Sequence, residues 1–307
     1  MVTSLQARTD TSIANALLRA GRKSTLFRVG FLIGPAAFWI AIFGLVPLCL
    51  VIFYSFMTHG EGGVIIFKPT LHNYIRLWQS SLYRGVLLDS LVIAFESTIV
   101  TLLLGYPIAY FLGRYRGRWS NLLIVLVLLP FWTSYLVRIF AWLLLLMDTG
   151  IINWVLLKVH LLSSPLHLLY TRLGVFIGIV YSALPFAILP IYAVIRGIDE
   201  DLVDAAQVLG AAPRYSFLEV ILPLSLSGIA AAAVLTYIYA AGAFLAPAIL
   251  GGNSAVMVSN IIIEQFLDAA NWPFASVLTV ALVLAILAIL FGTSRFVSLD
   301  VVYGVKN

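Results

Sequence analysis

The stretch DAAQVLGAAPRYSFLEVILPLSLSGI, from Asp204 to Ile229, interrupts a chain that is otherwise strongly apolar. Of the 307 residues, 62% are hydrophobic and 10% are charged, whereas about 25% of residues are charged in an ordinary soluble domain. This composition excludes a soluble globule and predicts a bundle of membrane-spanning helices. The place of the polar stretch relative to the membrane therefore decides how the chain is organised.

Six apolar runs are long enough to cross a hydrocarbon core of roughly 30 Å, which takes about 20 helical residues. The sequence thus predicts an all-α integral membrane protein with six transmembrane helices. The runs are residues 30–56, 86–113, 121–137, 173–195, 220–250 and 276–297. The first exceeds the apolar part of a cleaved signal peptide, so we expect it to be retained. The stretch 139–159 is interrupted by Asp148-Thr149-Gly150, and we expect an interfacial or re-entrant helix there.

The basic residues predict the orientation of the bundle, because cytoplasmic loops of membrane proteins are enriched in lysine and arginine. Segments on one side of the six runs carry twelve of them, and segments on the other side carry five. Both termini and the stretch from Asp204 are therefore predicted to be cytoplasmic. The net charge of +5 comes from residues that flank the runs, so it predicts membrane orientation and no nucleic-acid partner. The segment 1–29 is either a short helix on an anionic membrane surface or a disordered tail.

The residues of the polar stretch predict two short helices joined by a turn. From Ile198 to Leu209 the apolar residues recur at helical spacing, and carboxylates crowd the first turns, where they suit the positive end of the helix dipole. Gly210 is placed to end this helix. Pro213 is placed to begin the next one, because a proline there loses no hydrogen bond. The result is a knob of small side chains that a partner's backbone can approach closely, and the alternative is a solvated loop that only connects two spans.

The spacing within the stretch resembles a known family pattern. Asp204-Ala205-Ala206 is followed by three residues and Gly210, and after nine more residues by Val220-x-Leu222-Pro223. This resembles the EAA loop of permease subunits of ATP-binding cassette importers, whose pattern ends in I-x-L-P, with aspartate here in place of glutamate and valine in place of isoleucine. In that family the loop carries the coupling helix that sits in a groove of the nucleotide-binding subunit. The resemblance implies ATPase-coupling roles for Asp204, Ala205, Ala206, Gly210, Leu222 and Pro223.

Further segments resemble the spermidine/putrescine branch of these permeases. They are LGYPIAYFLGR (104–114), LPFWTSYLVRIFAW (129–142), LPFAILPIY (184–192) and NWPFASVLT (271–279). The resemblance implies a type I, MetI-like importer bundle. It would comprise a cytoplasmic N-terminal segment 1–29, a first helix 30–56 and a permease domain 85–297 with its coupling loop at about 198–223. It also implies a polyamine as cargo, although similar permeases are assigned to opines or aminoalkylphosphonates.

The same resemblance implies the partners of the chain and the membrane in which it lies. They are an ATP-binding cassette ATPase dimer, a second permease subunit, an extracytoplasmic substrate-binding protein and the lipid of the bacterial cytoplasmic membrane. The sequence contains no GxxxxGK[ST] loop to cradle phosphates. ATP and Mg²⁺ are therefore expected on the partner ATPase, with no cofactor bound by this chain. We expect a transporter subunit and no enzymatic activity.

Glu96 lies about ten residues into the second run and is the deepest acid of the predicted bundle. An ionisable group inside a span costs about 2.5–3.5 kcal/mol, so it invites a functional hypothesis. A carboxylate would replace part of the hydration that a polycation loses, and a hydrogen bond between helices is the alternative role. Aromatic faces also attract cations. The aromatic residues added to the predicted substrate path are Trp132, Tyr135, Tyr181, Tyr237 and Tyr239.

Two other classes of membrane protein fit the sequence less well. An intramembrane hydrolase needs a nucleophile and a base, or metal ligands, at matching depth. All four histidines lie outside the apolar runs, and Cys49 is the only cysteine, so neither a hydrolase site nor a metal site is predicted. A secondary carrier needs internal repeats and ion ligands within the membrane, and no repeat is evident. Co-purification of an ATPase would separate such a carrier from an importer.

Overall fold

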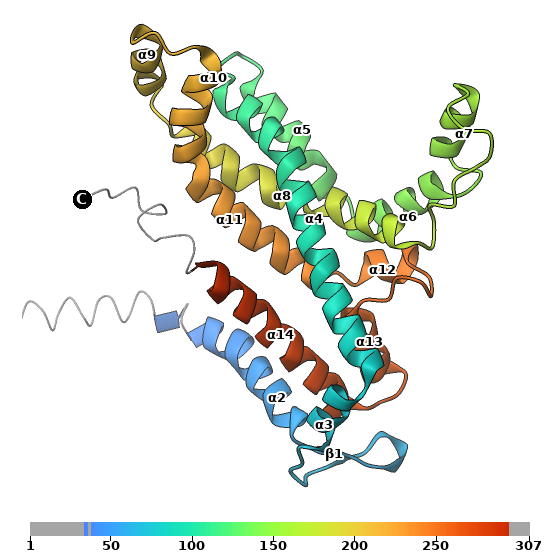
Figure 1. Ribbon diagram of the computed structural model, residues 1–307. Coiled ribbons are helices and arrows are strands. Elements are labelled where there is room, and N and C mark those ends of the chain that lie inside the picture. Colours follow the sequence, from blue (N-terminus) through green and yellow to red (C-terminus); the bar gives the residue numbers. More distant parts are fainter. Residues whose placement is uncertain (1–33, 36–37, 295–307) are drawn as a thin grey trace, which may run out of the picture.

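The computed structural model describes residues 34–35 and 38–294. The N-terminal segment 1–29, the start of the first predicted span and residues 295–297 of the last lie outside the described part. Within that part the chain is almost entirely helical, as predicted (Figure 1). In chain order the elements are η1 (Ala41–Leu45), α2 (Val46–Ser55), β1 (Thr58–His59), η2 (Glu61–Gly63), β2 (Ile65–Ile66), α3 (His72–Gln79), α4 (Ser81–Arg114), α5 (Ser120–Trp132), α6 (Tyr135–Leu146), α7 (Ile151–Lys158), α8 (Arg172–Arg196), α9 (Glu200–Val208), α10 (Pro213–Ser216), η3 (Phe217–Ile221), α11 (Leu222–Ala241), α12 (Leu245–Leu250), α13 (Val258–Leu267) and α14 (Trp272–Ser294).

Among the described residues, six segments are long and apolar enough to cross a membrane, which is the number that the sequence predicts. They are Phe38–Ser55, Ser81–Arg114, Tyr135–Lys158, Arg172–Arg196, Pro213–Ala241 and Trp272–Gly292. Five of them follow the predicted runs, and the third is displaced along the chain. The fifth is shorter at its end than predicted, because the helix stops at Ala241 and the following residues form the separate helix α12.

The third predicted span, residues 121–137, covers most of helix α5 and the start of α6. Helix α5 has 13 residues, which at 1.5 Å per residue reach about 20 Å and fall short of a hydrocarbon core. Pro130 lies inside α5, and the backbone of Thr133 is extended, with φ −84° and ψ 149°. The Thr133 hydroxyl donates to the Pro130 carbonyl at 2.6 Å. The longer apolar segment is Tyr135–Lys158, although residues 147–150 divide it into α6 and α7.

Helices α4, α8 and α11 form the centre of the bundle, and α2 and α14 lie side by side away from it (Figure 1). In the most apolar stretch of α8, 61% of the residues are buried, against 6% in the first span, so α8 is the central helix. Small residues let α4 and α8 touch. A Cβ on Gly105 would stand 3.1 Å from the Ala187 Cβ, and one on Gly113 would stand 2.6 Å from the Ile195 Cγ2. Close backbone approach of this kind holds helices together in lipid.

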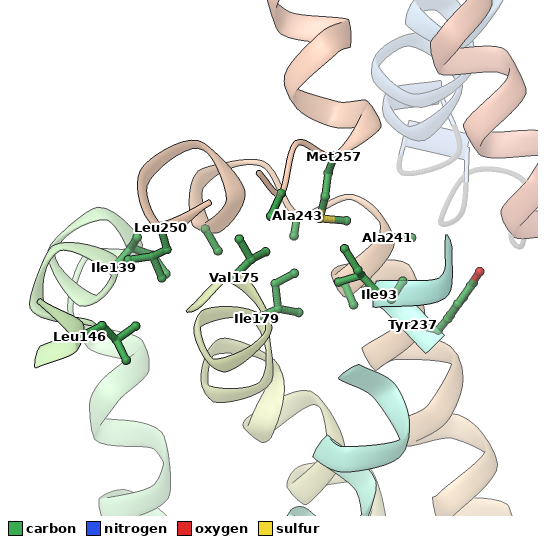
Figure 2. Packing of buried hydrophobic residues seen from close by; sticks show 14 residues of the cluster. Ile93, Ile139, Leu146, Val175, Ile179, Tyr237, Ala241, Ala243, Leu250 and Met257 are labelled. Carbon is green, nitrogen blue, oxygen red and sulfur yellow. The ribbon is translucent and has the colours of Figure 1, made fainter. Parts of the chain in front are cut away.

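A large cluster of buried apolar side chains lies where α4, α6, α8, α11 and α12 meet (Figure 2). Ile93 of α4, Ile139 of α6 and Ile179 of α8 are at most 3% exposed within it. Leu250 of α12 is fully buried in the same cluster. The cluster therefore fixes the short helices α6 and α12 to the N-terminal half of α8. It also brings these parts of α4, α6 and α8 to one level of the bundle.

Two proline residues follow a widened turn. The π-helical turns η1 and η3 end two residues before Pro47 and Pro223 respectively. A proline inside a helix lacks the N–H that would bond to the carbonyl four residues earlier, and its ring clashes with that carbonyl. Those carbonyls belong to Phe43 and Glu219, which lie within the two π-turns. A π-turn relieves such a clash by local widening, so the helix continues past each proline.

Candidate functional site

The polar stretch forms the two short helices that the sequence predicts. The Asp199 side chain caps α9 by accepting a hydrogen bond from the Asp201 N–H at 3.2 Å. Gly210 follows α9 with φ +90°, a left-handed conformation that glycine adopts without strain. The Gly210 N–H donates to the Gln207 carbonyl at 2.9 Å, and the Ala211 N–H donates to the Ala206 carbonyl at 3.0 Å. These two bonds are those of a Schellman motif, and α10 then begins at Pro213 as predicted.

Helix α9 has one face against the bundle and one face in the open. Val203 is 3% exposed and packs in a cluster with Ile198 and Ile221. The other apolar side chains of the segment, Leu202, Val208 and Leu209, are 51%, 87% and 88% exposed. Of the residues predicted to couple, Asp204, Ala205 and Gly210 are exposed, and Ala206 is partly buried. The tip of the α9–α10 segment is therefore an open surface of small and apolar side chains.

One arginine side chain links this segment to the loop after α4, and a second joins the ends of α4 and α8. Arg116, which follows α4, donates from Nε to Glu200 Oε1 at 2.9 Å. Arg196, the last residue of α8, donates from Nη1 to the Tyr115 carbonyl at 3.2 Å. The Arg116–Glu200 pair is about half exposed, so it contributes at most about 1 kcal/mol. The attachment therefore orients α9 more than it stabilises the fold.

Aromatic contacts connect the α9–α10 segment to α4 and α11. The Phe217 ring, in the π-turn η3, lies edge-on to the rings of Tyr106 and Tyr110 in α4, at centroid distances of 6.0 and 5.2 Å. The Tyr106 hydroxyl lies 3.0 Å from the Ser225 hydroxyl of α11. Leu222 and Pro223 are the first two residues of α11. A displacement of α10 therefore acts on α4 through packed rings and on α11 through the continuous backbone.

Glu96 forms an ion pair with Arg172, with Arg172 Nη2 and Glu96 Oε2 2.8 Å apart. The side chains of Glu96 and Arg172 are 46% and 49% exposed in this single chain. Eighteen residues separate it from the end of α4 at Arg114, which is about 27 Å. Because α4 extends well beyond the start of α8 at Arg172, Glu96 is central in its own helix but level with the end of its neighbour.

The predicted aromatic residues lie in separate places. Tyr135 and Tyr239 meet at 6.4 Å, and Phe186 stacks on Tyr239 at 4.9 Å. Arg138 lies over the rings of Phe131 and Tyr135, at 5.2 and 5.6 Å from their centroids. This aromatic cluster thus already holds a guanidinium cation on two of its faces.

The other three predicted aromatic residues lie outside the aromatic cluster. Tyr181 pairs edge-on with Trp142 at 5.4 Å. Trp132, at the end of α5, is 77% exposed, and Tyr237 is 5% exposed within the apolar core. Of the five predicted aromatic residues, the fold therefore brings Tyr135 and Tyr239 into contact with each other. The sequence does not predict Phe186 and Arg138 as their neighbours, or Arg172 as the partner of Glu96, because these contacts depend on how the helices pack.

No group of three or more His, Cys, Asp or Glu side chains that could hold a metal ion is found among the described residues. Cys49 is free and exposed on α2.

Comparison with known proteins identifies the family of the chain. Residues 105–302 match the family described as binding-protein-dependent transport system inner membrane component. The spermidine/putrescine transport system permease protein PotB of Haemophilus influenzae is 38% identical over 253 residues, which are 82% of this chain and 88% of that protein. PotB of Escherichia coli (strain K12) is 35% identical over 255 residues, which are 82% of this chain and 92% of that protein.

A solved structure supports the fold. A bacterial ABC transporter involved in the import of the acidic polysaccharide alginate aligns with a TM-score of 0.68 and 19% identity, over 89% of this chain and 96% of the other. At this identity the similarity concerns the fold alone. With the family match, it confirms the predicted class of fold. The family match and the PotB relatives show that the chain is a non-catalytic subunit. The chain belongs to the family of binding-protein-dependent transport system inner membrane components, and it is a multi-pass, non-catalytic permease subunit of an ABC importer with the type I importer fold.

Proposed function

We propose that this permease imports a polyamine such as spermidine or putrescine. The observation that carries the proposal is the identity of 38% and 35% with two permeases named for these cargos, over 82% of the chain in each case. The similarity to the alginate importer does not bear on cargo, because it rests on 19% identity. A different small solute, such as an opine or an aminoalkylphosphonate, is the alternative that the experiment below tests.

The α9–α10 segment is proposed as the docking element for the ATPase of the importer. Its support is the exposure of Val208 and Leu209, at 87% and 88%, on a segment that follows a span. Apolar side chains in that position gain from burial against a partner. Asp204 and Ala205 lie on the same exposed segment, and the small alanine side chain lets a partner's backbone approach. ATP and Mg²⁺ would be held by the ATPase dimer alone.

Movement of the docked segment would reach the bundle by two routes. One is the packing of Phe217 against α4. The other is the backbone from Gly210 and Ala206 through Leu222 and Pro223 into α11. ATP binding would close the ATPase dimer, draw the coupling segments of two permeases together and turn the bundle outward, and hydrolysis would reverse the change.

Glu96 is the proposed contact for a cationic cargo. Arg172 now satisfies its carboxylate at 2.8 Å, and both side chains are about half exposed. An ammonium group of the cargo carries the same single positive charge as the guanidinium, so it would replace Arg172 without leaving Glu96 unpaired. The displaced arginine would be solvated, because nothing buries it in this chain. The aromatic members of the proposed path are Trp132, Tyr135, Tyr181, Tyr237 and Tyr239, whose rings would attract a cation.

The proposed assembly has two permeases, because one six-span chain supplies half a pathway. A second permease would cover the exposed side of Glu96 and Trp132. A substrate-binding protein on the outside would deliver the cargo. Both termini and the α9–α10 segment would face the cytoplasm, as the distribution of lysine and arginine predicts.

The proposal is tested by uptake of radiolabelled putrescine and spermidine in cells that lack other polyamine importers. One strain would carry the complete transporter, and a matched strain would lack only this chain. We expect ATP-dependent uptake in the first strain that unlabelled spermidine inhibits and an opine does not. A complex that assembles with its ATPase and takes up no polyamine would refute the cargo. Failure of the ATPase to co-purify with the chain would refute the docking role instead.

A further inference from the structure

A hollow of about 530 Å³ opens at the end of the bundle opposite the α9–α10 segment. Its walls are the β1–β2 hairpin, the turn that leads into α3, α3 itself and the residue before α14. We call it the α3 hollow. The side chains that give it its chemical character are Lys68, Arg76, His59 and His72, and none of the described residues that line it is acidic. The hollow is therefore suited to an anionic group.

The two cations of the α3 hollow have no carboxylate partner among the described side chains. The ion pairs that the described side chains form involve other cations, namely Arg116, His167 and Arg172. Arg76 is held in place by other means. Its guanidinium lies 4.4 Å from the centroid of the Phe274 ring, and its Nη2 donates to the Tyr83 hydroxyl at 3.4 Å. The positive charge is thus fixed in position without being neutralised.

The α3 hollow lies at the level where spans end. Helix α2 ends at Ser55, whose hydroxyl lies 2.7 Å from the Tyr74 hydroxyl of α3. Asn271 lines the hollow, and the next residue, Trp272, begins α14. The Trp272 ring contacts that of Tyr54 at 6.4 Å. Tryptophan and tyrosine gather at the boundary between hydrocarbon and water, so these rings place the hollow at the headgroup level.

The exposed face of α3 and its flanks distinguishes a lipid partner from a soluble one. Leu71, Ile75, Trp78 and Leu82 are 61%, 48%, 72% and 61% exposed. Ile75 and Trp78 are three residues apart and so lie on one side of α3, and Leu77 is buried on the other side. Leu71 directly precedes α3, and Leu82 lies in the first turn of α4. A short helix with an apolar stripe beside basic residues lies in the plane of a membrane interface, with the stripe toward the acyl chains. The adjoining cations then face the headgroups.

We propose that the α3 hollow binds the phosphate of an anionic lipid headgroup in the leaflet at this end of the bundle. Lys68 and Arg76 supply the charge, and His59 and His72 supply further hydrogen-bond donors. The bound lipid would fix α3, and with it the junction between α2 and α4, to the membrane surface. This inference does not depend on which cargo the permease carries.

The test is a titration of phosphatidylglycerol into the detergent-purified importer complex, with bound lipid counted by native mass spectrometry. Lys68→Gln removes one charge of the hollow from an exposed side chain. Its matched control is Arg84→Gln, because Arg84 is an exposed cation at the same end that does not line the hollow. We expect Lys68→Gln to weaken phosphatidylglycerol binding roughly fivefold. Lys68→Arg and Arg84→Gln should leave it unchanged, and phosphatidylcholine should not compete.

Equal phosphatidylglycerol binding by the wild-type complex and Lys68→Gln would overturn the proposal. So would equal weakening by Lys68→Gln and Arg84→Gln, because it would indicate general attraction to the surface. The other occupant of such a hollow would be a carboxylate of the external binding protein. If Lys68→Gln left lipid binding intact but weakened docking of that protein, the hollow would be a protein contact and the lipid proposal would fail.

Discussion

Replacement of Gly210 tests whether the turn after α9 acts through its backbone. The residue has φ +90°, and a Cβ built on it meets no atom within 4 Å. Valine in this left-handed conformation would therefore be strained by about 1–2 kcal/mol, although its Cβ would meet no atom of this chain within 4 Å. Relief of that strain would break the bonds from the Gly210 and Ala211 N–H groups to Gln207 and Ala206. A loss of this size lowers the population of the intact turn roughly 5- to 30-fold.

Asparagine is the matched control, because it is close to valine in size but tolerates the left-handed conformation. The assay is the initial rate of cargo uptake per assembled complex, with complex measured by co-purification of the ATPase. We expect Gly210→Val to lose most of the uptake and Gly210→Asn to keep most of it. Equal losses in both variants would show that bulk in the partner's groove matters and backbone conformation does not. Full uptake by Gly210→Val would refute any need for the turn.

Three further predictions concern the spans and their attachment. Glu96→Gln should lower polyamine uptake at unchanged complex level, and wild-type kinetics would remove Glu96 from the path. Gly113→Ala places a Cβ 2.6 Å from the Ile195 Cγ2, so it should destabilise the bundle by about 1–3 kcal/mol, seen as a lower midpoint of thermal unfolding in detergent. Arg116→Gln removes the half-exposed pair with Glu200, so its effect on that midpoint should stay within about 1 kcal/mol; a larger shift would mean that the pair stabilises the bundle.

The spans were predictable where length and composition decide them. Helices α4, α8 and α14 follow the predicted apolar runs, and each begins before the start that the sequence predicts. The third span was not predictable in this way, because apolarity continues through the break at Thr133 and hydropathy does not register it. The helix end depends on Pro130 and on a local hydrogen bond from Thr133. Composition alone could not weigh these against the apolar run.

The polar stretch was more predictable than the substrate path, for a physical reason. A cap, a glycine and a proline act within a few residues of themselves, so Asp199, Gly210 and Pro213 specify their own geometry. The surroundings of Glu96 depend instead on the register of α4 against α8. That register is set by contacts far apart in sequence, such as those of Gly105 with Ala187. A single sequence does not display them, so the Arg172 partner went unpredicted.

The contacts between α4 and α8 bear on how coupling would work. Arginines at both ends of α8 contact α4 and the residue after it. Arg196 donates to the Tyr115 carbonyl at 3.2 Å, and Arg172 pairs with Glu96, near the middle of α4, at 2.8 Å. Between these two contacts, Gly105 of α4 packs closely against Ala187 of α8. Two helices joined in this way move as one body, so a displacement of α9 would be carried along them with little loss. The Glu96–Arg172 pair is about half exposed in this chain, whereas the small-residue contacts between the helices are buried. Of these connections, the ion pair is therefore the one that a cationic cargo can open without dismantling the bundle.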